Sequence, residues 1–149
     1  MREILFRGLH RRKGEKVRLD GTPVESRWVY GRYCQYNEER GIIYQTEPEI
    51  AKFSVYADTV GQYTGLTDRN GVKIFEGDIL KTRKYGKISD NIIVNGFDTF
   101  AVIYKPCMFR LVNRNRRFNF VNIRRDQLEV IGNVHDNPEM LGGDENETD

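Results

Sequence analysis

The sequence predicts an all-β protein in which an N-terminal β subdomain precedes a small β-barrel, with little helix. Five short runs rich in β-branched and aromatic residues fall within about 55 residues of the second half, separated by Gly, Pro and Asn. Nowhere do apolar residues recur at i, i+3, i+4 and i+7 along a dozen positions, as an amphipathic helix requires. At 149 residues, the chain is long enough for one domain or two very small ones.

The first part of the chain favours strands, with one segment left open. Leu5–Gly8 is a candidate short strand, and the basic stretch His10–Val17 is predicted to be a loop. Residues 47–57 are ambiguous, because Pro48 disfavours a central strand and Ile50–Tyr56 is compatible with either a short strand or a helical turn.

Between these segments the sequence predicts a β-hairpin. Trp28–Tyr36 is the first strand, Glu38–Gly41 the turn and Ile42–Gln45 the returning strand. Successive side chains of a strand point to opposite faces, so alternate residues share a face. One face of the first strand is expected to carry Trp28, Tyr30, Arg32, Cys34 and Tyr36.

Glycines recur through Asp58–Leu80 and predict successive tight turns. Within this segment, Asp68–Gly71 has the composition of a turn in which the aspartate accepts backbone N–H groups. A calcium loop would need a glycine at its sixth position and a carboxylate at its twelfth. Counted from Asp68, these positions are Lys73 and Ile79, which excludes a calcium site. The glycines are Gly61, Gly65, Gly71 and Gly77.

The second half of the chain contains the expected barrel strands. Turn residues separate them, and the insertion Tyr85–Asp98 is expected to be the longest loop. The five strands are Ile79–Lys84, Thr99–Lys105, Met108–Asn113, Phe118–Asn122 and Leu128–Gly132. The predicted organisation is an N-terminal β subdomain over 1–57, a glycine-rich connecting segment over 58–78, a barrel over 79–134 and a C-terminal extension with a disordered acidic tail over 135–149.

Charge is segregated along the chain, although the net charge is only +2. Residues 1–34 carry nine Lys and Arg against four Asp and Glu, and residues 35–80 carry four against eight. Residues 81–128 carry eleven against three, whereas residues 129–149 carry seven acidic residues and no Lys or Arg. A block of +8 is therefore followed by a block of −7, which can fold back and screen it.

Composition also limits the cellular setting. No apolar run approaches the roughly 20 residues of a membrane span, and the N-terminus lacks the apolar stretch of a signal peptide. Cys34 and Cys107 are too few for a disulfide framework and are interpreted as reduced packing residues. A soluble cytoplasmic protein without membrane contact is expected.

The ionisable residues do not form a recognisable active site. An acid–base pair of Glu76 and Asp78 has no nucleophile or second base nearby, and a tight turn whose carboxylates bind backbone donors is the favoured interpretation. The two histidines, His10 and His135, are not at metal-ligand spacing from each other or from a cysteine. We therefore expect no catalysis, no metal and no cofactor.

The basic block is the one feature that indicates a ligand. Its Lys and Arg residues are interleaved with aromatic residues, the combination that small β-barrels use to bind single-stranded nucleic acid. The residues singled out are Lys81, Arg83, Lys84, Lys87, Arg114, Arg116 and Arg117. In the competing interpretation the aromatic residues belong to the core and the arginines are solvated, because Phe118 and Phe120 share a face that excludes Arg117.

Several collinear segments resemble the YopX family of phage and prophage proteins. The strongest is Val60–Gly71, continuing into Ile74–Ile79. The other matching segments are Ile4–Gly8, Trp28–Gly31 and Val130–Glu139. The chain departs from the family pattern in His10–Arg18 and in residues 84–98.

The resemblance implies an all-β fold with a C-terminal SH3-like barrel, a phage or prophage origin and a bacterial cytoplasm. It supplies no catalytic residue and no cofactor, because the family is uncharacterised. The expected protein is a small, non-catalytic binding or accessory factor that contacts nucleic acid through the basic barrel face. The alternative is an adaptor for a host or phage protein, or a self-assembling protein, that uses exposed strand edges and aromatic residues.

Overall fold

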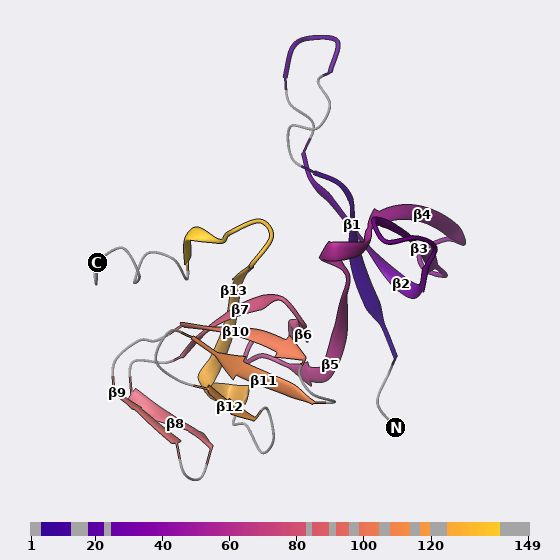
Figure 1. Ribbon diagram of the computed structural model, residues 1–149. Helices are drawn as coiled ribbons and strands as arrows, with labels where there is room; N and C mark the ends of the chain where they lie inside the picture. The colour runs from indigo at the N-terminus through magenta and orange to yellow at the C-terminus, as the bar shows by residue number, and fades with distance from the viewer. Residues whose placement is uncertain are drawn as a thin grey trace. The chain divides into compact units, whose positions relative to one another are not determined.

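The computed structural model describes residues 4–12, 18–22, 25–82, 85–89, 92–95, 99–104, 108–113, 117–119 and 125–140. Their regular structure is antiparallel β with two single turns of 3₁₀ helix, so the all-β prediction is confirmed (Figure 1). The chain divides into two compact units, Met1–Tyr63 and Thr64–Asp149, and the boundary falls inside a strand. Among the described residues, no helix has both the length and the apolar character needed to cross a membrane.

The first unit is built around a curved sheet. Its strands follow the order β4-β3-β2-β1-β5, in which neighbouring strands are hydrogen-bonded, and β6 (Lys73–Phe75) completes this six-stranded sheet beside β5. The 3₁₀ turn η1 (Ala57–Thr59) follows β4 directly. The strands are β1 (Phe6–Arg11), β2 (Arg27–Gln35), β3 (Arg40–Gln45), β4 (Ala51–Tyr56) and β5 (Gly61–Thr67).

Strand register confirms the predicted hairpin and defines two faces of this sheet. Tyr33 of β2 lies opposite Ile43 of β3, which in turn lies opposite Phe53 of β4, so these three side chains share the inner face. The core of the unit is formed by Val29, Ile43 and Val55, with Phe6, Tyr33, Phe53 and Val60 packed against it. The outer face carries Trp28, Tyr30, Arg32 and Cys34, as the alternation predicts.

The sheet curls into a ring-like arrangement that is not a closed barrel. A Cβ atom added to Gly8 in β1 would lie 3.0 Å from Val55 in β4, so these strands approach each other across the curl. In the sheet order, however, β4 is an edge strand and β1 lies between β2 and β5. The Thr59 hydroxyl links β1 to the end of β4. It accepts the Leu9 N–H of β1 at 2.9 Å and donates to the carbonyl of Tyr56, the last residue of β4, at 2.6 Å.

The structure decides two predictions for the first unit, those for His10–Val17 and for Ile50–Tyr56. The predicted loop His10–Val17 is wrong at its start, because β1 continues to Arg11. The His10 ring contributes to this extension, since its Nδ1 lies 2.6 Å from the Ser54 carbonyl oxygen of β4. The segment left open over Ile50–Tyr56 forms a strand rather than a helical turn.

The second unit contains a five-stranded antiparallel sheet in the order β12-β11-β10-β7-β13. The chain enters it through β5, which is followed by β6 (Lys73–Phe75), and the 3₁₀ turn η2 (Arg125–Gln127) directly precedes the last strand. The sheet strands are β7 (Asp78–Thr82), β10 (Thr99–Tyr104), β11 (Phe109–Val112), β12 (Arg117–Asn119) and β13 (Leu128–Asn133). The core is formed by Ile74, Leu80, Phe100, Val102, Phe109, Leu111 and Leu128, with Leu66 and Val130 packed against it.

Each predicted barrel strand therefore overlaps an observed strand, but the prediction of a long loop over Tyr85–Asp98 is wrong. Within the insertion Tyr85–Asp98, β8 (Tyr85–Ser89) and β9 (Ile92–Asn95) pair as an antiparallel hairpin. Three consecutive β-branched residues in β9 favour this extended conformation, although neither run is long enough to display alternation. Residues 83–84, 105 and 120–122 of the predicted strands, and the predicted disordered tail beyond residue 140, lie outside the described residues.

Candidate nucleic-acid interface

The Asp68 carboxylate, buried in the glycine-rich segment, holds the path of the chain. Asp68 is 3% exposed and accepts three backbone N–H groups at 2.8–2.9 Å, from Asn70, Val72 and Val130. Gly71 completes the turn with a φ of 82°, a left-handed conformation that glycine adopts without steric cost. The prediction of a turn at Asp68–Gly71 is confirmed.

A second turn, over Glu76–Asp78, leads into β7, the first strand of the second unit's sheet. The Asp78 carboxylate is 1% exposed and accepts the Phe75 N–H at 2.7 Å. Gly77, with a φ of 93°, donates its N–H to the Val102 carbonyl and accepts the Val134 N–H, each at 2.8 Å. This confirms the turn interpretation of Glu76–Asp78, because the aspartate binds a backbone donor of its own turn.

The predicted basic residues of the second unit are described only in part. Lys81 lies on β7, partly exposed, opposite Thr99 of β10 and Glu129 of β13. The Glu129 carboxylate also lies 3.4 Å from Arg69, so acidic charge is present beside Lys81. Lys87 lies in β8 and Arg117 in β12, but their side chains are not described. The residues outside the described ranges are Arg83, Lys84, Arg114 and Arg116.

The first unit contains a set of cation–aromatic contacts that sequence reasoning missed. Arg12 and Arg40 both lie over the Tyr56 ring, with their Cζ atoms 4.1 Å and 4.2 Å from its centroid. Two further pairs have the same distance of 4.9 Å: Arg7 over Trp28 and Arg27 over Phe53. Such contacts contribute about 0.5–1 kcal/mol at exposed sites. The partners are far apart in sequence, so only the folded sheet brings them together.

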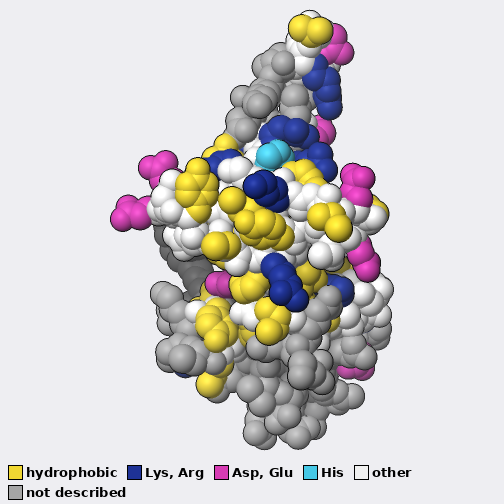
Figure 2. Space-filling view, turned by 90° about the vertical axis from the view of Figure 1, so that its right-hand side faces the viewer, with side chains coloured by type: hydrophobic (Ala, Val, Ile, Leu, Met, Phe, Trp, Pro, Cys, Tyr) yellow, Lys and Arg dark blue, Asp and Glu magenta, His cyan; other side chains and the backbone are white. Residues whose placement is uncertain are grey.

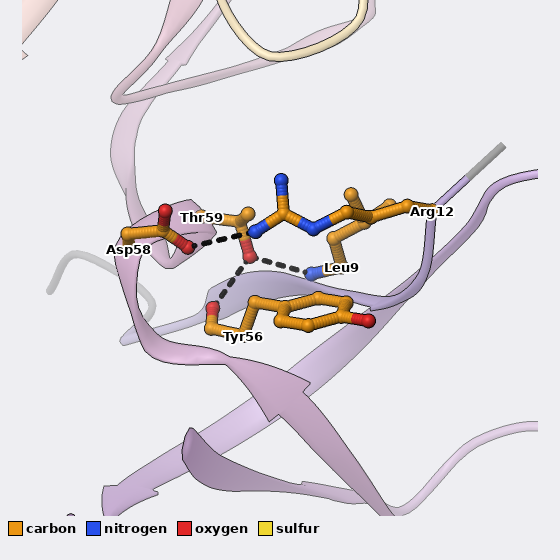
Figure 3. Close-up of polar contacts among 5 residues, drawn as sticks. All are labelled: Leu9, Arg12, Tyr56, Asp58 and Thr59. Carbon is orange, nitrogen blue, oxygen red and sulfur yellow. Dashed lines mark hydrogen bonds and ion pairs between the residues drawn. The ribbon is translucent and has the colours of Figure 1, made fainter. Parts of the chain in front are cut away.

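Figure 3 shows how η1 positions Arg12. The guanidinium lies above the Tyr56 ring, and its Nη2 is 3.3 Å from Oδ1 of Asp58. The two charged side chains are 49% and 75% exposed, so solvent screening limits this ion pair to about 0–1 kcal/mol. Arg12 is therefore oriented by its surroundings, and part of its charge is offset.

The His10 ring of β1 contacts two neighbouring residues of β4. His10 packs edge-on against Phe53 with centroids 5.3 Å apart, in addition to its contact with the Ser54 carbonyl. The Ser54 hydroxyl accepts two bonds from Arg40, at 3.1 Å from Nε and 2.8 Å from Nη2. In the part of the chain that the structure describes, no group of three or more His, Cys, Asp or Glu side chains is arranged to hold a metal ion.

The pKa values of Tyr33 and Asp20 depart from their ordinary values. Partial burial raises the pKa of the Tyr33 hydroxyl, and the neighbouring Cys34 adds to the rise. The Thr22 side chain and backbone N–H both bond to the Asp20 carboxylate and lower its pKa. At neutral pH these shifts keep the tyrosine neutral and the aspartate charged, so neither group is tuned for proton transfer near neutrality.

Fold and contacts together define a class of protein: an antiparallel β protein of two compact units, whose buried aspartates fix turns and whose N-terminal sheet is rich in arginine. The chain matches the YopX protein family over residues 6–142 and belongs to that family. The crystal structure of protein EF1440 from Enterococcus faecalis is similar, with 22% sequence identity, 95% of this chain and 99% of that chain covered, and a TM-score of 0.49. None of the curated proteins matches the chain at a significant level.

Proposed function

We propose that this protein is a phage- or prophage-encoded, non-catalytic accessory factor that binds nucleic acid in the cytoplasm of a bacterial host. One observation carries the proposal: residues 81–128 of the second unit hold eleven Lys and Arg against three Asp and Glu. A surface with this excess of cations attracts phosphates by releasing their counterions. The contacting residues are Lys81, Arg83, Lys84, Lys87, Arg114, Arg116 and Arg117.

The proposed scaffold for this surface is an SH3-like barrel. The sheet order β12-β11-β10-β7-β13 supports it, because the last strand returns to lie beside the first strand of the sheet. The edge strand β12 is only three residues long, and short edge strands limit the exposed edge of a sheet.

A protein–protein adaptor, or a protein that assembles with copies of itself, is the second candidate. The observation that favours it is the exposure of large apolar side chains in both units. Ile50 and Tyr36 are 90% and 65% exposed in the first unit, and Tyr104 and Met108 are 42% and 36% exposed in the second. Such residues contribute to protein interfaces when they gather into a patch.

Fluorescence anisotropy with labelled oligonucleotides, at about 50 mM and about 200 mM salt, tests the first candidate. Changing Arg114, Arg116 and Arg117 together to Gln should weaken binding at least about tenfold and reduce the slope of log K against log salt by about 2. The control changes Lys13, Lys16 and Arg18 to Gln, which alters the net charge equally in the first unit. Equal losses in both variants would show that only net charge matters. No binding at the lower salt would overturn the proposal, and a solution mass above the monomer would then favour self-assembly.

A further inference from the structure

The outer face of the first unit's sheet carries cationic and aromatic side chains in alternation. Arg32 of β2 lies opposite Tyr44 of β3, and Tyr44 lies opposite Lys52 of β4. Tyr30 precedes Arg32 by two residues on the same strand and so shares its face, diagonal to Tyr44 at about 7–8 Å between Cα atoms. We refer to Tyr30, Arg32, Tyr44 and Lys52 as the tyrosine platform.

The platform side chains face solvent. Tyr30 and Tyr44 are each 45% exposed, and Arg32 and Lys52 are exposed as well. The core lies on the opposite face of the same strands, where Ile43 is fully buried. Both tyrosines are therefore partly exposed on the face away from the core, where a base can reach an aromatic ring.

The strands that form this face contain no acidic residue. Strands β1 to β4 include no Asp or Glu, and their cationic residues are Arg7, Arg11, Arg27, Arg32, Arg40 and Lys52. Figure 2 shows one side of the described surface, on which Lys and Arg lie among hydrophobic side chains and most Asp and Glu lie toward the margins of the view. Exposed cations on strands without acidic residues favour contact with a polyanion.

Backbone packing fixes the spacing of the two tyrosines. Gly31 lies between Tyr30 and Arg32, and a Cβ atom added to it would collide with the backbone carbonyl of Tyr44. Only glycine permits this approach of β2 to β3, because a carbonyl group cannot rotate away as a side chain can. Arg7 of β1 lies opposite Tyr30 and is only 7% exposed, so the strand beside Tyr30 is closely packed at this position. The rings are thus positioned before any ligand arrives.

We propose that the tyrosine platform binds single-stranded nucleic acid, with bases stacked on Tyr30 and Tyr44 and phosphates contacting Arg32 and Lys52. Sheet-borne aromatic rings that each stack one base, flanked by cations, are a general means of single-strand recognition. Paired bases are stacked inside a duplex and cannot reach such rings, so single strands are preferred. The inference takes its ligand from the proposed function but assigns it to a different unit, and single-stranded DNA and RNA share the required chemistry.

The test uses the full chain and fluorescein-labelled dT12, U12 and a 12-base-pair DNA duplex at about 50 mM salt. Tyr30→Ala and Tyr44→Ala should each weaken binding of a single-stranded probe by roughly 5- to 100-fold. Tyr30→Phe and Tyr44→Phe keep the rings and should bind like the parent protein. Tyr104→Ala removes a tyrosine 42% exposed in the second unit, and a loss of affinity there as large as in Tyr30→Ala and Tyr44→Ala would overturn a specific role of the platform. Far-UV circular dichroism establishes that each variant is folded.

The outcomes separate this inference from the proposed function. If the parent protein binds no probe, both fail. If it binds and the second-unit arginine variant loses affinity while the two alanine variants do not, the platform is overturned and the proposed function stands. Duplex bound as tightly as dT12 and U12 would also overturn the platform. A preference for dT12 supports a DNA ligand at the platform and a preference for U12 supports RNA, provided that the alanine variants abolish it.

Discussion

At the scale of single residues, Asp68 joins parts of the second unit that are distant in sequence. Two of its backbone donors belong to its own turn, but the third is Val130 in β13, 62 residues away. Arg69 adds a second link, since its N–H donates to the Leu128 carbonyl at 3.1 Å. One buried carboxylate therefore fixes both the turn and the position of the last strand against it.

Replacing Asp68 by Ala should destabilise the second unit by about 1–3 kcal/mol or more, because three backbone donors lose their acceptor. Asp68→Asn keeps a carbonyl oxygen and should lose less. Asp58→Ala is the control, because this carboxylate is 75% exposed and its loss should cost no more than about 1 kcal/mol. Urea unfolding followed by far-UV circular dichroism measures each change, and an unchanged midpoint for Asp68→Ala would contradict the assigned role.

The same residues show how far sequence can predict a site. The bonds within Asp68–Gly71 follow from local turn chemistry and were predictable. The bond to Val130 was not, because its partner is brought in by the sheet. The contacts of Arg12 and Arg40 with Tyr56 were missed for the same reason. A period-two pattern indicated that Tyr30 and Arg32 share a face, but only strand register adds Tyr44 and Lys52.

At the scale of elements, the three-residue turn η1 keeps the first unit's sheet curled. Thr59 is 2% exposed, and its hydroxyl links the end of β4 to β1 through Tyr56 and Leu9. The hairpin β8–β9 gives a contrasting lesson, because it was expected to be a loop. Its strands are too short to show the alternation of apolar and polar residues that predicts a strand. Their extended structure depends on their pairing with each other.

Thr59→Val removes this hydroxyl with almost no change in volume. We expect a loss of about 1–3 kcal/mol, because the Leu9 N–H is left buried without its acceptor. Thr59→Ser keeps the hydroxyl and should lose clearly less. Thermal unfolding followed by tryptophan fluorescence is a suitable measurement, and a larger loss in Thr59→Ser than in Thr59→Val would mean that the methyl group, not the hydroxyl, matters.

At the scale of the whole molecule, the two units have separate cores. Of the residues that the structure describes, none belongs to both the cluster around Ile43 and the cluster around Leu80. The single tryptophan, Trp28, lies in the first unit, whereas far-UV circular dichroism senses strands of both. Fluorescence is thus a selective probe of one unit.

This arrangement predicts that the variants shift different signals. Asp68→Ala should lower the midpoint seen by circular dichroism more than the midpoint seen by Trp28 fluorescence. Thr59→Val should have its larger effect on fluorescence. Coincident transitions by both probes in both variants would instead indicate that the chain unfolds as one cooperative body.

Strand β5 affects how the two units could be exchanged between related proteins. The boundary between Tyr63 and Thr64 lies in the middle of its seven residues. Its first residues pair with β1, and the Thr64 hydroxyl donates to the Ile74 carbonyl at 2.8 Å in the second unit. A chimaera joined at the boundary would divide this strand between two parents. Exchange of either unit with that of a relative therefore requires a β5 compatible with both sheets, and this one strand limits which halves can be combined.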